Sequence, residues 1–450
     1  MAEQQNPIAG RLEAAAANLT AGHVDRGLIA EQSGLLRYLG YDDGNTANAQ
    51  GRARMLRAAA RFRRLFVLPV PDAPGLVVFG GEADPSIFGP LQEGLPIGNL
   101  AGSGLSPQRA FEACVGEGIE YLSQFVQAYD AAASGSLAEY GKTHDAHAKR
   151  FISEVLAVTN VDAGRSIAWV PARRMTDGLE TWLPLDLCYR RAVSQQDFKP
   201  PLKLSTGCAA GPTVEVATLR ALLELIERDA VALWWRGGRR GRAIAPDSEA
   251  GRAAEGLLGQ VRRGRVDRKS WLLDITTDLG INAVAAVSAR SDGYGFALGV
   301  AAHLSLAEAA RAAIFELCQA ELGHHVVAAK RYESGDAALN ESDLRRLKLG
   351  TLLDTRNCAL LQPESGPNSI SAELSLDTAT GLQHVLDRLA ACGIAAYALV
   401  LTRPQFGVPV VRVTAPGLQL EPCQIVGARL ARALRETGGG DMHHGGLPLL

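Results

Sequence analysis

The feature that most constrains the fold of this chain is a long apolar helical pattern that carries acidic side chains. It lies in the segment from Lys203 to Trp235, which reads KLSTGCAAGPTVEVATLRALLELIERDAVALWW. A strand-like stretch and a turn come first, and Pro212 and Thr213 then open the helical pattern. Leucine and isoleucine leave few polar faces on this helix, which is typical of a helix buried in a core.

The same helix carries Glu215, Glu224 and Glu227. Glu224 and Glu227 are three residues apart, about 60° on a helical wheel, so they share a face. Glu215 precedes Glu224 by nine residues, nearly the opposite face, and its place in the first turn also suits the helix dipole. Carboxylates on an apolar helix are costly unless a cation or donors meet them. Arg228 cannot neutralise all three, so two interpretations stay open: a hard cation such as Mg²⁺ that bridges phosphates, or an ion pair with Arg228 beside solvated residues.

Two further helical patterns repeat this design. Ser106 and Pro107 open the first with an N-cap and a proline at the first helical position, and it places Glu117 and Glu120 three residues apart. Ser305 opens the second, with Glu308 completing a capping box, and it places Glu316 and Gln319 three residues apart. Each helix follows a glycine-containing, strand-like segment. A design that occurs three times favours one shared acidic site.

The central segment STGCAAGPTVEVATLRALLELIERDA closely resembles the signature of the YcaO family. Members of that family bind ATP and Mg²⁺ with acidic helices and activate the amides of peptide bonds. The pair Glu117 and Glu120 matches the family's earlier acidic element, and the stretch ending in ELCQ matches its later one. The segments 169–189 and 400–418 also resemble family segments, the former one seen in members that process peptide natural products.

The resemblance implies an α/β (α+β) fold in which helices cover mixed β-sheets and three Glu-bearing helices surround one nucleotide site. Residues 61–450 form the expected catalytic domain. Residues 1–60 are an expected helical accessory segment, or alternatively a helical cap on that domain. The implied ATP-binding residues are Glu117, Glu120, Glu215, Glu224, Glu227, Arg228, Arg311, Glu316 and Gln319. The implied Mg²⁺ ligands are Glu117, Glu120, Glu224, Glu227 and Glu316.

The chain departs from the family pattern in two places. Cys114 and Tyr121 stand where the first acidic element usually has serine and arginine, which puts a phosphate contact there in doubt. The tail LPLL keeps only Pro448 of the Pro-x-Pro-x-Pro ending that ring-forming members often have. We expect the tail after the glycine joint at 438–440 to enter the site. The free carboxylate of Leu450 is then the expected catalytic base.

The activity that the resemblance implies is ATP-dependent formation of azoline rings from Cys, Ser or Thr in a ribosomally made peptide. Backbone thioamidation with a TfuA-like partner and a non-catalytic scaffold role in a maturation complex are the alternatives. Expected partners are the precursor peptide, a ThiF-like or TfuA-like protein that captures its leader, a flavin dehydrogenase, and a second copy of the chain or another subunit.

Composition excludes several other classes of function. The 450 residues carry a net charge of −2, which argues against nucleic acid as a partner. No apolar run reaches the roughly 18 residues that a membrane span needs, and the polar start resembles no signal peptide. The seven cysteines are scattered without a C-x-x-C pair, which favours a reducing cytoplasm over a disulfide frame or zinc site. Three of them, Cys114, Cys208 and Cys318, lie on or near the acidic helices, where small core residues are expected.

The remaining pattern alternates strands with helices. We expect the third acidic helix to end at His324 and His325, because cations suit a helix C-terminus. We also expect a polar surface excursion over 333–347, a helix over 375–392 with Ser375 as N-cap, and a final helix over 419–437.

Overall fold

The structure is a computed structural model that describes residues 8–20, 30–44, 48–89, 92, 94–130, 132–140, 146–364 and 376–449. The chain forms two compact units. Unit 1 comprises Met1–Pro69, Val77–Leu222 and Ala395–Pro416, and unit 2 comprises Val70–Leu76, Leu223–Ile394 and Gly417–Leu450. Each unit therefore contains segments that lie far apart in the sequence.

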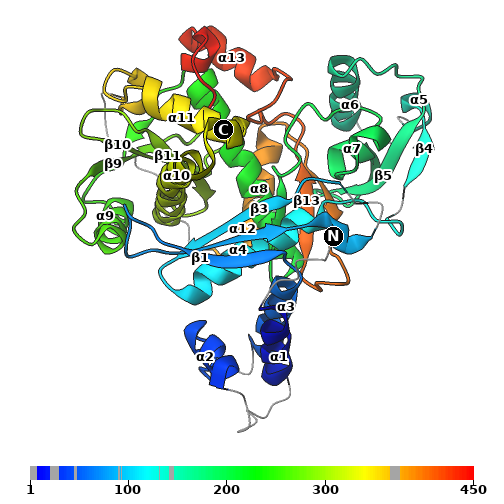
Figure 1. Ribbon diagram of the computed structural model, residues 1–450. Coiled ribbons are helices and arrows are strands. Elements are labelled where there is room, and N and C mark those ends of the chain that lie inside the picture. The colour runs from blue at the N-terminus through cyan, green and yellow to red at the C-terminus, as the bar shows by residue number, and fades with distance from the viewer. Residues whose placement is uncertain are drawn as a thin grey trace. The chain divides into compact units, whose positions relative to one another are not determined.

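Unit 1 holds two sheets and the helices around them (Figure 1). Its helices are α1 Ala9–Thr20, α2 Ala30–Tyr38, α3 Ala49–Ala60, α4 Pro107–Ser123, α5 Leu137–Tyr140, α6 Ala146–Val158 and α7 Leu185–Cys188. Its strands are β1 Arg64–Leu68, β2 Val77–Ala83, β3 Gly98–Gly104, β4 Ala133–Gly135, β5 Ile167–Arg174, β6 Glu180–Pro184, β7 Cys208–Ala210, β12 Tyr397–Val400 and β13 Val410–Thr414.

The strands of unit 1 pair in antiparallel fashion. β1, β2 and β3 form one sheet in that order, and a second sheet has the order β4-β5-β12-β13-β7 with β6 beside β5. Helix α4 packs directly on β3. A Cβ at Gly102 would lie 2.1 Å from the amide nitrogen of Cys114, so glycine is required for the backbones of β3 and α4 to approach this closely.

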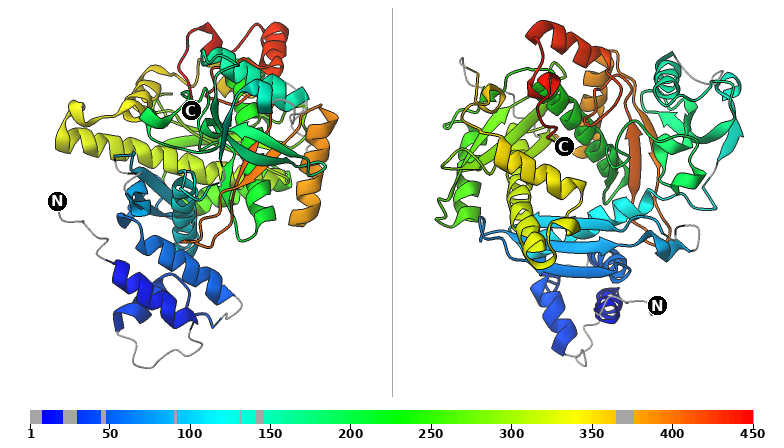
Figure 2. Two further views of the ribbon diagram at one scale, coloured as in Figure 1. Left: turned by 90° about the vertical axis from the view of Figure 1, so that its right-hand side faces the viewer. Right: turned by 45° about the horizontal axis from the view of Figure 1, so that its top comes forward.

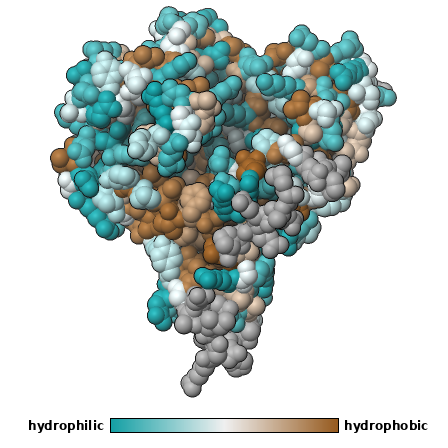
Figure 3. All heavy atoms as spheres, viewed as in Figure 1, coloured by the Kyte–Doolittle hydropathy of each residue, from teal (hydrophilic) through white to brown (hydrophobic). Residues whose placement is uncertain are grey.

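Strand β1 is an edge strand with exposed apolar side chains. Phe66 and Val67 are exposed, and an apolar area lies over this strand in Figure 3. The ring of Phe66 covers Gly80 on the neighbouring strand β2.

Unit 2 is built on a four-stranded antiparallel sheet of order β11-β10-β9-β8. Its strands are β8 Arg242–Ala243, β9 Arg268–Asp274, β10 Asn282–Arg290 and β11 Ala297–His303. Its helices are α9 Glu249–Arg262, α10 Leu306–Ser334, α11 Glu341–Leu352, α12 Thr378–Ala391 and α13 Ala428–Thr437. Helix α8, Val214–Val231, starts in unit 1, and the part from Leu223 onward belongs to unit 2. A π-helical turn, Ala232–Arg236, continues it.

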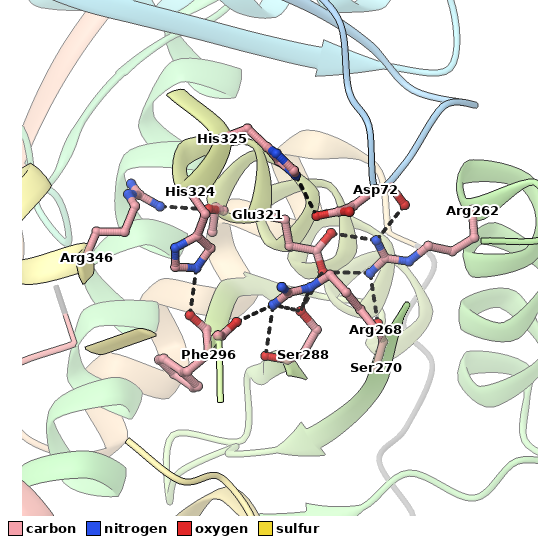
Figure 4. Close-up of polar contacts among 12 residues, drawn as sticks. Asp72, Arg262, Arg268, Ser270, Ser288, Phe296, Glu321, His324, His325 and Arg346 are labelled. Carbon is pink, nitrogen blue, oxygen red and sulfur yellow. Dashed lines mark hydrogen bonds and ion pairs between the residues drawn. The ribbon is translucent and has the colours of Figure 1, made fainter. Parts of the chain in front are cut away.

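Helix α10 is the longest helix of unit 2 and packs along β11 and β10 (Figure 2). An ionic cluster beneath it, shown in Figure 4, surrounds the fully buried carboxylate of Glu321. Arg262 binds that carboxylate with two hydrogen bonds of 2.6 and 2.7 Å, and Arg268 adds one of 3.0 Å. The hydroxyl of Ser288 donates to it as well. The cluster joins α10 to α9, β9 and β10.

The C-terminal tail packs into the core of unit 2. Leu449 is buried in the cluster that contains Val231, Trp234 and Trp235, and the indole NH of Trp235 donates to the carbonyl of Leu447 over 2.8 Å. The expected glycine joint is therefore held in place as far as residue 449.

The expected fold class is confirmed on its α+β side, and the described residues between 9 and 60 lie mostly in helices α1, α2 and α3. Two local expectations were wrong. Helix α10 continues past His324 and His325 to Ser334, and the last helix begins at Ala428 instead of 419. The polar stretch at 333–347 lies at the surface as expected and contains most of α11. Ser375 lies outside the described residues, and Asp377 is the N-cap of α12. No described helix combines the length and the apolar character that crossing a membrane requires.

Candidate functional site on three acidic helices

The helices α4, α8 and α10 begin in the same way. The hydroxyls of Ser106, Thr213 and Ser305 each accept a hydrogen bond of 3.2–3.3 Å from the amide three residues later. Each polar pair then falls eleven and fourteen positions after its capping residue: Glu117 and Glu120, Glu224 and Glu227, and Glu316 and Gln319. The common spacing places the three pairs at equivalent heights on their helices.

In unit 1 the carboxylates of α4 are held by the amides of two strands. Glu117 accepts a hydrogen bond of 2.7 Å from the Ala101 amide on β3. Glu120 accepts one of 2.7 Å from the Ala210 amide on β7. Hydrogen bonds from amides stabilise ionised carboxylates and fix their direction.

Unit 2 repeats the strand-to-helix contact. Glu316 on α10 accepts a hydrogen bond of 3.2 Å from the amide of Val300 on β11. The donor lies 16 residues before the acceptor, the same separation as between Ala101 and Glu117. A strand, a capped turn and a helix with a strand-bound glutamate thus occur in both units.

The second half of α8 carries the most strongly charged part of the site. Arg228 lies 3.1 Å from a carboxylate oxygen of Glu227 and 3.6 Å from one of Glu224. The oxygen Oε1 of Glu227 is buried and has no aligned hydrogen-bond donor among the described residues. Arg228 therefore compensates these carboxylates by charge more than by directed hydrogen bonds.

The cluster on α8 holds two carboxylates and one guanidinium, and the carboxylate of Glu227 is buried. Burial raises the pKa of Glu227 well above its ordinary value; Arg228 opposes the rise, and Glu316 and Glu224 add to it. The side chain of Glu316, by contrast, is exposed to solvent, which screens its charge more than that of Glu227. Glu224 and Glu227 share the guanidinium of Arg228. A cation or a proton bound beside them would offset the remaining negative charge.

The donor set fits Mg²⁺ that shares its ligands with phosphate. Carboxylate oxygens are the ligands that Mg²⁺ prefers, and it usually takes one or two of them together with phosphates and water. Within the part of the chain that the structure describes, no three His, Cys, Asp or Glu side chains are arranged to hold a metal ion by themselves.

The other expected residues lie in different surroundings. Glu215 is exposed in the first turn of α8, where its own amide and the Thr213 hydroxyl lower its pKa, and two and a half helical turns separate it from Glu224. Arg311 is exposed and pairs with Glu308 at 3.6 Å. Gln319 is partly exposed on α10. Leu450, the expected catalytic base, lies outside the described residues.

The cysteines on the acidic helices are buried. Burial raises the pKa of Cys114 to about 12, with a further contribution from Glu117. Burial likewise raises the pKa of Cys318 to about 12. Thiols with such values do not ionise near neutral pH, which agrees with the expected role as core residues.

A family model described as YcaO cyclodehydratase, ATP- and Mg²⁺-binding, matches residues 101–419, well over half of the chain. The chain belongs to the YcaO family. The cofactors ATP and Mg²⁺ expected from the sequence are those of the YcaO family, and membership supports an ATP-dependent enzyme that activates amides.

Solved YcaO-type structures share this fold. A heterocyclase in complex with substrate and cofactor is 25% identical with a TM-score of 0.66, over 83% of this chain and 52% of that one. The chain thus spans about half the length of that heterocyclase. YcaO from Methanopyrus kandleri, bound with AMPPCP and Mg²⁺, is 18% identical with a TM-score of 0.53, over 79% of this chain and 85% of that one. An uncharacterized protein in the tfuA 3′ region of Rhizobium leguminosarum bv. trifolii is 27% identical over 57% of this chain and 62% of its own length.

Sequence reasoning missed some residues that shape the site. The strand amides that hold the YcaO carboxylates leave no trace in side-chain patterns. Arg412 does leave one, because it interrupts the apolar run VPVVRV at 408–413, and it is nevertheless buried.

Proposed function

We propose that this chain uses ATP and Mg²⁺ to activate backbone amides of a ribosomally made peptide and so forms azoline rings from Cys, Ser or Thr. The observation that carries the proposal is the excess of carboxylate around Arg228. A cation bound with phosphates removes that excess, and it is what the family's cofactors provide.

The residues have separate roles in this proposal. Glu117, Glu120, Glu224, Glu227 and Glu316 hold Mg²⁺ and the nucleotide. Arg228 orders the carboxylates of α8, because it contacts both of them. The strand amides at Ala101, Ala210 and Val300 fix the direction of the glutamates before the ligand binds, and such preorganisation lowers the cost of binding.

ATP, when bound, supplies a phosphoryl group that turns the amide oxygen into a leaving group. The attacking group is a Cys, Ser or Thr side chain of the peptide, and the released species are phosphate and ADP. The chain must position two reactants and exclude water from them. We assign the Leu450 carboxylate as the base for the attacking group.

Thioamidation is the second candidate. It is favoured by the relative from a tfuA 3′ region and by a tail that keeps only Pro448 of the ring-former ending. In that case an external sulfide source attacks the amide and a TfuA-like protein is the partner. For ring formation the partners are a leader-binding ThiF-like protein and a flavin dehydrogenase.

Titration calorimetry with MgATP tests the site directly and needs no peptide. The variant Glu224→Gln with Glu227→Gln should bind MgATP at least about tenfold more weakly, the usual effect of losing charge-assisted contacts. Glu308→Gln on α10 is the matched control, because Glu308 is exposed and lies in the first turn. Equal MgATP affinity in the folded double variant and the wild type would refute the site.

Mass spectrometry decides between the two reactions. The substrate is a Cys/Ser/Thr-rich peptide encoded beside the gene for this chain. Loss of one water per modified residue supports azoline formation, and exchange of one oxygen for sulfur establishes thioamidation instead.

A further inference from the structure

Arg190 and Arg412 of unit 1 form no ion pair with a carboxylate of the described residues. Arg412 on β13 is buried, and its guanidinium donates to the carbonyls of Leu204 and Thr206. Its Nε is buried without an acceptor. Arg190 is partly exposed, and its Nε donates to the side chain of Gln124 over 2.8 Å.

The two arginines lie on adjoining elements: Arg412 is opposite β7, and Arg190 lies over Tyr121 of α4, the helix that binds β7 through Glu120. Burial lowers the pKa of Arg190 below its ordinary value; Tyr121 opposes this, and Arg412 lowers the pKa further. Among the described residues, no carboxylate forms an ion pair or hydrogen bond with either arginine. Two like charges in a poorly solvated place are unfavourable unless an anion joins them.

The donors of Arg190 are arranged to receive such an anion. Its Nη1 and Nη2 groups have no hydrogen-bond acceptor among the described residues, and its guanidinium lies over the ring of Tyr121 at 5.6 Å. This contact and the bond to Gln124 fix the orientation of the planar fork. Arg412 contributes its charge from the buried side.

This pair lies close to a carboxylate of the acidic site within the same unit. Arg412 pairs with Cys208 in the β13–β7 register, and Glu120 binds the amide of Ala210, two residues along β7. Two residues of a strand span about 7 Å. Tyr121, beneath Arg190, directly follows Glu120 on α4. A carboxylate proposed to bind Mg²⁺ and an arginine fork on adjoining residues suit the two sides of a metal–phosphate group.

We propose that Arg190 and Arg412 form a phosphate-binding subsite, with Arg190 as the contacting residue and Arg412 as the fixed charge behind it. The subsite adds a phosphate contact to the proposed function. Only the source of the phosphate depends on that function. That source is either the nucleotide or the free phosphate released in the reaction. Tyr121 stands where the first acidic element usually has an arginine. Arg190, which lies over Tyr121, would provide the missing positive charge there.

The test uses the full chain, inorganic phosphate, MgATP and AMP as probes, with thermal shift and calorimetry as readouts. Arg190→Gln should weaken phosphate binding about tenfold or more, because it removes charge-assisted hydrogen bonds. Arg190→Lys keeps the charge without the fork and should recover part of the affinity. Arg173→Gln is the control, since Arg173 is an exposed arginine of β5 paired with Glu180.

The ligands distinguish the sources. Weaker binding of both phosphate and MgATP, with AMP binding unchanged, assigns the subsite to the nucleotide. Weaker phosphate binding alone assigns it to the free phosphate. Unchanged binding of phosphate and MgATP in folded Arg190→Gln and Arg190→Lys overturns the proposal, as does a change only in the KM for peptide, which would indicate a substrate carboxylate. A wild type that binds phosphate through Arg190 but neither MgATP nor peptide would refute the proposed function and leave the subsite standing.

Discussion

Replacing Glu321 by glutamine should strongly destabilise unit 2. The carboxylate is fully buried, and it accepts hydrogen bonds from Arg262, Arg268 and Ser288. The side chains of both arginines are at most 10% exposed, so they cannot turn to water when the negative charge is removed. An amide also brings an NH₂ group toward guanidinium donors.

The expected cost is about 3–5 kcal/mol, the usual penalty for removing one partner of a buried charge pair. The two orphaned guanidiniums place Glu321→Gln toward the upper end of that range. Urea unfolding monitored at tryptophan measures it, with hydrogen exchange locating the loss to α9, α10 and β9.

The exposed Glu308 at the start of the same helix supplies the control. Its partner Arg311 is exposed as well, so Glu308→Gln should change the unfolding free energy by no more than about 0.5 kcal/mol. A loss below about 1 kcal/mol in Glu321→Gln would show that water or rearranged donors satisfy the arginines, and the argument from burial would then be wrong.

Three further predictions follow from the described contacts. The raised pKa of Glu227 means that the folded protein binds more protons than the unfolded chain above pH 4.5; without ligands the unfolding free energy should therefore fall as pH rises from there, and Glu227→Gln should flatten that slope in urea titrations. A slope equal to that of the wild type would contradict the shift. Gly102→Ala should cost about 1–3 kcal/mol of thermal stability, because the new methyl group meets the α4 backbone, whereas Gly116→Ala, with no described atom within 4 Å of its Cβ, should stabilise α4 by about 0.5–1 kcal/mol. Deleting Leu450 moves the terminal carboxylate back to Leu449 and should sharply reduce product formation with MgATP affinity unchanged; a wild-type rate would show that the reaction needs no carboxylate at position 450.

The elements that could be predicted from the sequence are those whose signals are local. Ser106 and Ser305 cap α4 and α10 as expected, because an N-cap is bonded to an amide three residues away. The start of α11 also has a local signal, a capping box between Asn340 and Asp343, and the polar composition around it obscured this signal.

The failures have distant causes. Helix α10 continues past its two histidines. The ring of His324 is hydrogen-bonded to the carbonyl of Phe296, and the ring of His325 to the carboxylate of Asp72. Both partners are distant in the sequence, so the local pattern could not predict these contacts. The late start of α13 has a similar cause. The side-chain oxygen of Gln419 accepts a hydrogen bond from the amide of Gly427, and the backbone amide of Gln419 donates to Asp229. These hydrogen bonds hold this segment out of the helix.

The candidate site also has some features that follow from local sequence patterns and others that depend on tertiary contacts. Spacing along each helix predicts the glutamates, whereas the surplus of carboxylate around Arg228 and the proposed subsite of Arg190 and Arg412 depend on which strands and helices meet. Arg412 in particular has no charged neighbour in its own strand segment.

The packing of the tail on Trp235 gives the protein its own optical signal. The indole NH is bonded to the carbonyl of Leu447, and the ring is 1% exposed. Departure of the tail breaks that bond and brings water to the ring, which shifts indole emission to longer wavelength. Because the π-helical turn that carries Trp235 directly continues α8, the helix of Glu224 and Glu227, the combined tryptophan fluorescence contains a signal for the tail at the end of the acidic helix without any attached dye.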